Sequence, residues 1–402
     1  MADELAEPFR FEYDPATVRY GPNCVSQLAS EVTALGCERV LVVTGSTVGE
    51  TAAVMDPVRA GLDDRLAGVF AGTAPTKRLG TAYDALSQYL DADADAIVAV
   101  GGGSSLDVAT VLSVLVATDR EPDAVGAELL DRGTISVPDS GLPPVITVPT
   151  TLAGADLSQV AGVTADPATC PVEAPVSGGI GDAKLMPAAA CYDPVLMATT
   201  PESVLAGAAM NGFDKGLETL YARNRTPITD ATAVRGLGLL ADGLEALGTG
   251  EADKTTFQRL TRGILLVQYG ISRPDGTTLS LLHAFGHGLT RTDDVQQGTA
   301  HAIIAPHALE YLFEAVDGRR ELLAEALGVG DAVTPAAAVV DRVAAIAAGL
   351  GLPTRLRDVD GPDRDAFPAV ADAVLEDSFM RNAPPGLDPT RAEIVAVLEA
   401  AW

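Results

Sequence analysis

The sequence predicts an α/β domain with a parallel sheet over residues 1–190, followed by an all-α domain over residues 191–402. Two observations support this division. Between about residues 38 and 150, short apolar runs alternate with helical stretches, which is typical of a parallel sheet with crossover helices. After residue 194, long stretches rich in Ala, Leu and Val with helical spacing continue almost to Trp402.

Four apolar runs are the predicted strands of the sheet. They span residues 40–43, 66–70, 96–100 and 145–148. Ahead of them, segments 9–13 and 18–21 predict an edge hairpin, after which Gly21-Pro22-Asn23 leads into a first helix. Residues 151–192 are rich in Gly, Pro, Ala and Thr with little periodicity, so they predict an irregular or short-stranded connection. Turn-forming residues interrupt the helical domain at 272–276, 328–330, 351–353 and 383–386.

Composition and charge exclude several classes of protein. The chain has 402 residues, of which 47% are hydrophobic, so it can bury a sizeable core and is not intrinsically disordered. It carries 55 Asp and Glu against 27 Lys and Arg, a formal net charge of −28. Such a charge opposes binding to nucleic acid or to an anionic membrane.

The acidic residues are scattered along the chain, and arginine is favoured over lysine. Four lysines are present, namely Lys77, Lys184, Lys215 and Lys254. This pattern predicts a protein adapted to high salt, with an ordinary acidic cytosolic protein as the alternative.

The N-terminus predicts a cytoplasmic protein, since it shows neither the basic region nor the apolar region of a signal peptide. No apolar run reaches membrane-spanning length. The four cysteines are widely spaced and form no CxxC pair, which argues against a disulfide framework or a cysteine metal site. We expect them to be small core residues.

A glycine triplet follows the third predicted strand. The sequence Gly101-Gly102-Gly103-Ser104-Ser105-Leu106-Asp107 stands where a strand passes into a helix. Glycines let backbone N–H groups approach a pyrophosphate, and the helix N-terminus adds partial positive charge. The loop therefore predicts a phosphate cradle, although triple glycine also occurs in plain tight turns. It is neither a GxGxxG motif nor a P-loop.

The fourth strand is followed by a similar ligand-binding position. Thr150, Thr151 and Leu152 come directly after Pro149. Hydroxyl groups at the carboxyl end of a parallel strand lie where open α/β sheets bind their ligands. A simple Pro-Thr turn is the alternative.

All four histidines fall in one stretch of the helical domain, at positions 283, 287, 301 and 307. His283 and His287 are four residues apart and so share one helix face, which suits joint metal ligation or two rings lining one pocket. The pair lacks the glutamate of an HExxH motif, so a zincin protease is not indicated.

One lysine stands in an otherwise weakly charged helical segment of this domain. Asn211, Lys215 and Glu218 share a helix face. Lys215 either carries a functional ammonium group or forms a surface contact with Glu218, and the sequence leaves both interpretations open.

Taken together, these motifs resemble the iron-containing alcohol dehydrogenase superfamily, and within it the maleylacetate reductases. The resemblance covers nearly the whole chain and includes the glycine loop with Asp107, the Pro149-Thr150-Thr151 segment, the helix around Glu218 and the His283 stretch. It implies a dehydroquinate-synthase-like fold in which a Rossmann-like domain and a helical domain hold a nicotinamide cofactor between them. It also implies a homodimer or larger assembly.

The metal positions of that superfamily are altered here. Metal-dependent members use an Asp, a His four residues later, a third His and a fourth His fourteen residues after it; those positions are Asn211, Lys215, His283 and Gln297. The ammonium group of Lys215 would supply the positive charge that a divalent cation normally provides there. A metal ion is therefore not expected. A shifted register, with Asp214, Glu218 and His283 as ligands, remains an alternative.

The resemblance implies hydride transfer between a nicotinamide and a small, carboxylate-bearing carbonyl compound or alcohol. Lys215 would stabilise the alkoxide, and His283 or His287 would supply the proton. The predicted substrate-binding residues are Asn211, Arg291, Gln297 and His301, with Arg291 proposed for the carboxylate.

The predicted cofactor is NAD(H) or NADP(H). Its binding residues are Gly45, Ser46, the loop Gly101, Gly102, Gly103, Ser104 and Ser105, Asp107, and Thr150, Thr151 and Leu152. No carboxylate follows the first strand at Thr44-Gly45-Ser46-Thr47, so NADP(H) should be tolerated. The lysine that many relatives place near residues 177–181 is missing.

Three other functions remain open at this point. They are a metal-dependent alcohol or glycerol dehydrogenase, a dehydroquinate-synthase-like lyase with no net cofactor consumption, and a non-catalytic dinucleotide-binding protein.

Overall fold

A computed structural model describes residues 8–13, 16–274, 276–292 and 295–402, without the side chains of Ser272, Arg291 and Thr292. The chain forms two compact units. The sheet unit comprises residues 16–212 and 242–265; the helical unit comprises 213–241, 266–402 and the described N-terminal segment. The chain passes between the two units more than once, after residues 212, 241 and 265. The predicted boundary near residue 190 stays a prediction.

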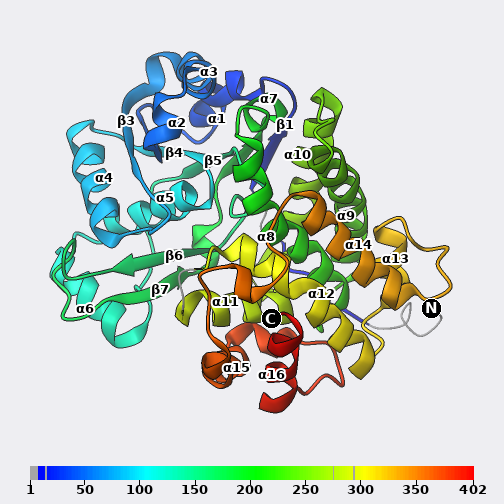
Figure 1. Cartoon of the computed structure of the whole chain (residues 1–402). Coiled ribbons are helices and arrows are strands. Elements are labelled where there is room, and N and C mark those ends of the chain that lie inside the picture. The colour runs from blue at the N-terminus through cyan, green and yellow to red at the C-terminus, as the bar shows by residue number, and fades with distance from the viewer. Residues whose placement is uncertain (1–7, 14–15, 275, 293–294) are drawn as a thin grey trace. The chain divides into compact units, whose positions relative to one another are not determined.

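The sheet unit is built on a six-stranded parallel sheet in the order β1-β8-β5-β4-β2-β3 (Figure 1). Its strands are β1 (Thr17–Tyr20), β2 (Val40–Gly45), β3 (Leu66–Thr73), β4 (Ala96–Gly101), β5 (Val145–Pro149) and β8 (Ala189–Tyr192). The four strands predicted from apolar runs are confirmed as β2 to β5.

The predicted edge hairpin is wrong. β1 is an edge strand, but it pairs in parallel with β8, and residues 8–13 contain no strand. The aromatic side chains of that segment are used differently. Phe11 stacks on Tyr13 and lies under Arg273, and Tyr13 packs against Tyr269, all within the helical unit.

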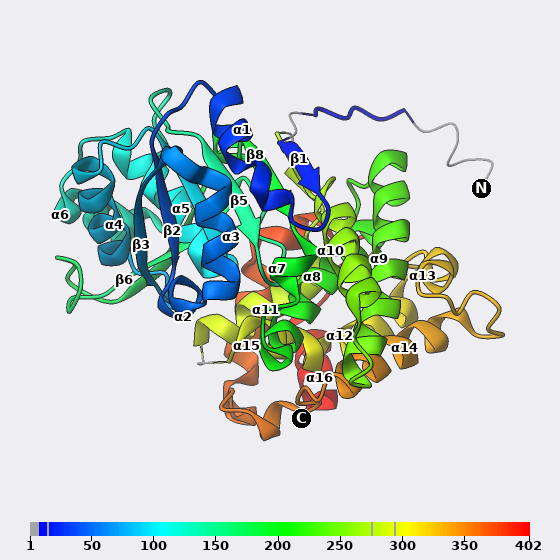
Figure 2. The same cartoon turned by 90° about the horizontal axis from the view of Figure 1, so that it is seen from above.

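Helices cover both faces of the sheet, as Figure 2 shows. Those of the sheet unit are α1 (Leu28–Ala34), α2 (Ser46–Glu50), α3 (Ala52–Leu62), α4 (Leu79–Asp91), α5 (Gly103–Val116), α6 (Pro122–Arg132) and α7 (Pro194–Met197). The predicted first helix is confirmed as the 3-10 turn η2 (Cys24–Gln27) and α1. Between β5 and β8, β6 (Val160–Ala165) and β7 (Val176–Gly181) form an antiparallel pair, as a short-stranded connection predicts.

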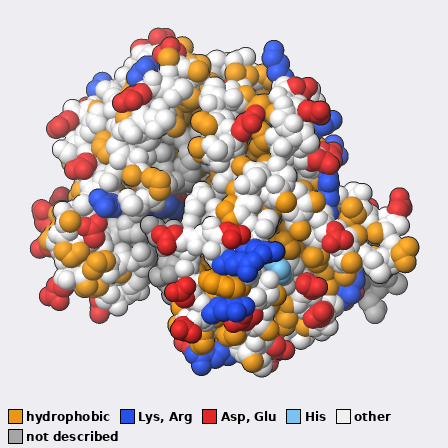
Figure 3. Space-filling model, viewed as in Figure 1, with side chains coloured by type: hydrophobic (Ala, Val, Ile, Leu, Met, Phe, Trp, Pro, Cys, Tyr) orange, Lys and Arg blue, Asp and Glu red, His pale blue; other side chains and the backbone are white. Residues whose placement is uncertain are grey.

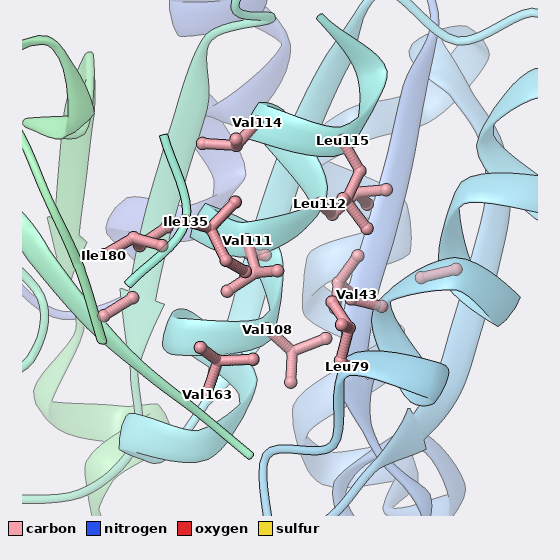
Figure 4. Packing of buried hydrophobic residues seen from close by; sticks show 14 of the residues in the cluster. Val43, Leu79, Val108, Val111, Leu112, Val114, Leu115, Ile135, Val163 and Ile180 are labelled. Carbon is pink, nitrogen blue, oxygen red and sulfur yellow. The ribbon is translucent and has the colours of Figure 1, made fainter. Parts of the chain in front are cut away.

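Alternate strand residues enter two separate cores. Val40 and Val42 pack with α1 and α3, whereas Leu41 and Val43 pack with α4 and α5. Figure 4 shows the second core, where Val43 faces Leu79 and the apolar side chains of α5. A strand buried on both faces needs apolar residues at every position, which is why these strands are continuous apolar runs.

The helical unit follows the predicted pattern. Its own helices are α11 (Leu281–Thr292), α12 (Gln297–Ala315), α13 (Arg320–Ala326), α14 (Pro335–Gly349), α15 (Phe367–Glu376) and α16 (Arg391–Ala400). Both units share α8 (Glu202–Tyr221), α9 (Pro227–Gly248) and α10 (Lys254–Gln268). The predicted break at 272–276 is the short pair β9 (Ser272–Arg273) and β10 (Gly276–Thr277), although Asp275 lies outside the described residues.

The cysteines and the surface agree with the sequence. Cys170 and Cys191 are buried, Cys24 and Cys37 are half-buried, and all four are free thiols. Acidic side chains are scattered over the face seen in Figure 3. In the part of the chain that the structure describes, no helix combines the length and apolar character of a membrane span.

Candidate active site

The glycine loop lies at the carboxyl end of β4, beside β2. In the sheet, β3 lies on one side of β2 and β4 lies on the other. The direction in which successive strands are added therefore reverses between β2 and β4. The two following helices also cover opposite faces of the sheet, since α3 packs in one core and α5 in the other. Open α/β sheets bind ligands at such a switch point.

The backbone of the glycine loop is shaped for the close approach of a ligand. Gly101 has φ +137°, a conformation that side chains rarely adopt. A Cβ on Gly102 would lie 3.1 Å from Thr151 Cγ2, so the two predicted cofactor segments touch. α5 begins at Gly103 without a side-chain N-cap. Its first N–H groups are therefore suited to receive a phosphate group.

The segment after β5 is fixed by hydrogen bonds. Thr150 donates its N–H to Gly101 O at 3.0 Å, and Thr200 Oγ1 donates to Thr150 O at 2.7 Å. Gly212 on α8 touches this segment so closely that a Cβ would lie 2.0 Å from Leu152 O. The contact requires glycine and holds the middle of α8 against this segment.

Ser46 and Asp107 take different positions around this loop. Ser46 is exposed and begins α2 directly after β2. Asp107 lies in α5, is 7% exposed, and pairs with Lys77 Nζ at 2.6 Å. The structure thus gathers the predicted cofactor residues at the carboxyl edge of β2, β4 and β5.

In the helical unit, three imidazoles each bind a carboxyl group through Nδ1. His283 Nδ1 lies 2.6 Å from Glu218 Oε2, His301 Nδ1 lies 2.8 Å from Asp214 Oδ2, and His287 Nδ1 lies 2.8 Å from Asp377 Oδ2. The rings of His283 and His301 meet edge to face, with centroids 4.5 Å apart. Each ring is therefore held in place through Nδ1 by a carboxyl group of the helical unit.

Two of the pairs are buried, and burial disfavours charge on each of their groups. Burial raises the pKa of Asp214 and Glu218 well above the usual range, because it disfavours a carboxylate. Burial likewise lowers the pKa of His283 well below its usual range and that of His301 to about 3. Burial therefore favours the uncharged form of all four groups.

The third pair differs because it reaches solvent. The His287 side chain is 28% exposed, whereas that of Asp377 is 1% exposed. Asp377 is fixed by the N–H of Phe379, which donates to Oδ1 at 2.9 Å, and the Phe379 ring lies 5.2 Å from that of His287. His287 is thus an oriented imidazole that can exchange protons with bulk water.

Lys215 belongs to the same group. It is half-buried on α8, and its positive charge is among the causes that lower the pKa of both His283 and His301. The structure thus brings together an ammonium group and the three imidazoles predicted from sequence. The fourth histidine, His307, is half-buried further along α12, and burial lowers its pKa.

The predicted substrate-binding residues lie in several places. Asn211 Nδ2 donates to Ala153 O at 3.0 Å, beside the predicted cofactor segment. Gln297 is half-buried at the start of α12. His301 is fully buried, and a Cβ on Gly286 would lie 2.5 Å from its Nε2. Arg291 belongs to α11, and its side chain lies outside the described part of the structure. The substrate-binding roles of these four residues stay predictions.

Three of the four positions that the resemblance assigns to metal ligands hold neither a carboxylate nor an imidazole. At the four positions where metal-dependent relatives carry ligands, Asn211 donates to a backbone carbonyl and Lys215 supplies a cation. In the alternative register, Asp214 and Glu218 bind different imidazoles. Within the described ranges, no three His, Cys, Asp or Glu side chains are arranged to hold a metal ion.

Sequence reasoning missed Asp377 and Phe379. They lie about ninety residues beyond His287, at the start of the 3-10 helix η7 (Ser378–Asn382). The only local signal is that Asp377 caps this short helix by accepting from Phe379 N. A capping aspartate occurs before many helices, so that signal does not indicate a histidine partner.

Comparison with known proteins covers both units. The profile described as iron-containing alcohol dehydrogenase matches residues 15–194, and that of the Fe-containing alcohol dehydrogenase family C-terminal region matches residues 205–402. Maleylacetate reductase 1 of Cupriavidus pinatubonensis is 27% identical over 385 residues, covering 94% of this chain and 93% of the relative.

Two further matches also span nearly the full length. Lactaldehyde reductase of Escherichia coli K12 is 26% identical over 394 residues, covering 96% of this chain and 98% of the relative. The crystal structure of a protein described as an alcohol dehydrogenase from Ralstonia eutropha JMP134 superposes with a TM-score of 0.78 at 28% identity, covering 98% of each chain.

Proposed function

Because the chain belongs to the iron-containing alcohol dehydrogenase family, we propose that it is an NAD(P)(H)-dependent oxidoreductase that works without a metal ion. Its proposed substrate is a small, carboxylate-bearing carbonyl compound or the corresponding alcohol. The observation that carries this proposal is Lys215, a cation placed beside neutral imidazoles where relatives bind a metal. The similarity to a maleylacetate reductase supports the substrate class.

In this proposal the sheet unit binds the cofactor, which supplies the hydride when it is bound. The N–H groups at the start of α5 hold the pyrophosphate, and the glycines of the loop allow its close approach. Thr150 and Thr151 offer hydroxyl groups on the neighbouring strand end.

The helical unit supplies charge and a proton. The Lys215 ammonium stabilises the negative charge that develops on the carbonyl oxygen. His287 donates a proton from Nε2 to that oxygen, and Asp377 orients the ring through its hydrogen bond to Nδ1. His283 and His301 are buried and neutral, so they shape the site without supplying a proton.

Asp377 can be tested as a positioning residue. Asp377→Asn should lower kcat by about tenfold to a hundredfold, since the His287 ring loses the carboxyl group that orients it through Nδ1. KM for the cofactor should not change. Steady-state kinetics across pH 5–9 measures the effect, with Asp372→Asn, an exposed ion-pair partner of Arg391, as the matched control. Unchanged kcat at every pH would refute this role.

Ser46 can be tested as a determinant of cofactor choice. It begins α2 at the end of β2, where a carboxylate would repel the 2′-phosphate of NADPH. Ser46→Asp should therefore lower kcat/KM for NADPH by about tenfold or more and leave that for NADH nearly unchanged. Ser46→Ala is the control, and equal losses with both cofactors would contradict the assignment.

The proposed function itself is tested by following NADH and NADPH oxidation at molar KCl with a panel of keto acids and aldehydes that includes maleylacetate and lactaldehyde. Oxidation of a cofactor with a keto acid is the expected result. A lyase would convert its substrate without net oxidation of cofactor, and a non-catalytic relative would bind NADH without turnover. Either result would overturn the proposal.

A further inference from the structure

Lys77 forms an ion pair inside the sheet unit, next to the glycine loop. It lies in the connection between β3 and α4, and its Nζ is 2.6 Å from Asp107 Oδ2. The same oxygen accepts the N–H of Gly162 at 3.2 Å. The Lys77 side chain is 30% exposed, whereas that of Asp107 is 9% exposed, so the pair keeps one open side.

The pair lies one helical turn from the phosphate cradle. Asp107 follows Gly103 by four residues, so both lie on the same face of α5. Small residues line this face. A Cβ on Gly103 would contact the methyl groups of Ala155 and Ala153 at 3.6 and 3.9 Å, and one on Gly162 would lie 3.4 Å from both Asp107 Oδ2 and Lys77 Nζ.

The connection that carries Lys77 is held at both ends. Thr73 Oγ1 and Ser105 Oγ hydrogen bond at 2.7 Å, which fixes the end of β3 to the first turn of α5. Thr164 N donates to Lys77 O at 3.0 Å. Lys77 also has φ +50°, a conformation that is unfavourable for a lysine and persists only where the surroundings determine it.

A carboxylate at position 107 would oppose a dinucleotide. The N-terminus of α5 attracts phosphate, but a negative charge one turn away on the same face repels it. The chain also carries a net charge of −28, which adds to that repulsion. A cation beside Asp107 offsets the repulsion between the Asp107 carboxylate and the phosphate.

We infer that Lys77 is a positioning residue of the dinucleotide site: it holds Asp107 and cancels its charge, so that the start of α5 can bind the cofactor pyrophosphate. This inference rests on the proposed function. It gives one of the four lysines a role that the sequence motifs do not indicate, because Lys77 and Asp107 come from different crossover units.

The test is a double-mutant cycle read by NADH binding, followed through the fluorescence of bound NADH. Lys77→Met should weaken NADH binding by about tenfold, raise KM for NADH by a similar factor and leave kcat at saturating NADH unchanged. Lys77→Arg should retain most of the affinity. Lys184→Met is the matched control, since Lys184 forms surface ion pairs with Asp139 and Asp182 in the same unit.

Two further readouts separate charge neutralisation from a purely structural role. In an Asp107→Asn background, Lys77→Met should have almost no effect on NADH affinity. The loss caused by Lys77→Met should also shrink as KCl rises, because salt screens the repulsion. Far-UV circular dichroism at each salt concentration checks that the variants are folded.

The outcomes also separate this inference from the proposed function. If the unaltered protein binds neither NADH nor NADPH, the proposed function fails. If it binds NADH and Lys77→Met binds equally well, the inference fails while the proposed function stands. A loss of affinity that persists in the Asp107→Asn background would also overturn the inference, since Lys77 would then act independently of Asp107.

Discussion

Replacing Lys215 with methionine should lower kcat for carbonyl reduction by about a thousandfold while NADH binding stays nearly unchanged. Methionine keeps much of the side-chain volume but removes the only cation that we assign to the developing alkoxide. Loss of one preorganised oxyanion-stabilising group costs about a hundredfold to a thousandfold in other enzymes. Under the proposed function no metal ion compensates for this loss, so we expect the upper end of that range.

The matched control is Lys254→Met, which removes an exposed lysine at the start of α10. This variant should keep full activity. NADH binding of Lys215→Met, measured by fluorescence, separates a catalytic defect from a loss of cofactor affinity. If Lys215→Met retained full turnover, the ammonium group would merely fill the volume of a lost metal site.

The second large effect is expected for His287. His287→Asn removes the solvent-accessible imidazole that is oriented by Asp377, and kcat should fall by about a hundredfold to ten-thousandfold, the range typical of a lost general acid. KM for the cofactor should change little. The measurement is steady-state reduction of the best substrate from the panel, with NADH saturating.

His307→Asn provides the comparison, because His307 is half-buried in α12 and is assigned no part in the reaction. It should leave kcat nearly unchanged. Equal activity of His287→Asn and the unaltered enzyme would assign the proton donor elsewhere, with His283 as the next group to test.

Much of the fold is predictable because the inner strands of the sheet are buried on both faces. The resulting apolar runs identify β2, β4 and β5 directly, and the edge strand β3 is a half-buried apolar run. β8 was not predicted as a strand, since it is four residues long and lies in a segment without clear periodicity. The failed hairpin has a related cause. The sequence pattern at 9–13 shows an aromatic face, but only the tertiary structure decides that Phe11 packs under Arg273 and does not pair with β1.

The candidate site divides in the same way. The glycine loop and the spacing of His283 and His287 are local signals, so sequence alone indicates them. Asp377 and Lys77 are recognisable only from their partners, which lie far away in the chain. Burial also decides a point that sequence leaves open: His283 is enclosed whereas His287 reaches solvent, although both stand on one helix face.

The most direct test of metal independence is a paired measurement on one preparation. Purified enzyme is treated with chelator and dialysed into molar KCl, after which its metal content is determined by elemental analysis and its carbonyl reduction rate is compared with that of untreated enzyme. The proposal predicts substoichiometric metal and an unchanged rate. Loss of activity on chelation, restored by adding a divalent metal ion, would contradict the assignment of Lys215 as the group that replaces the metal.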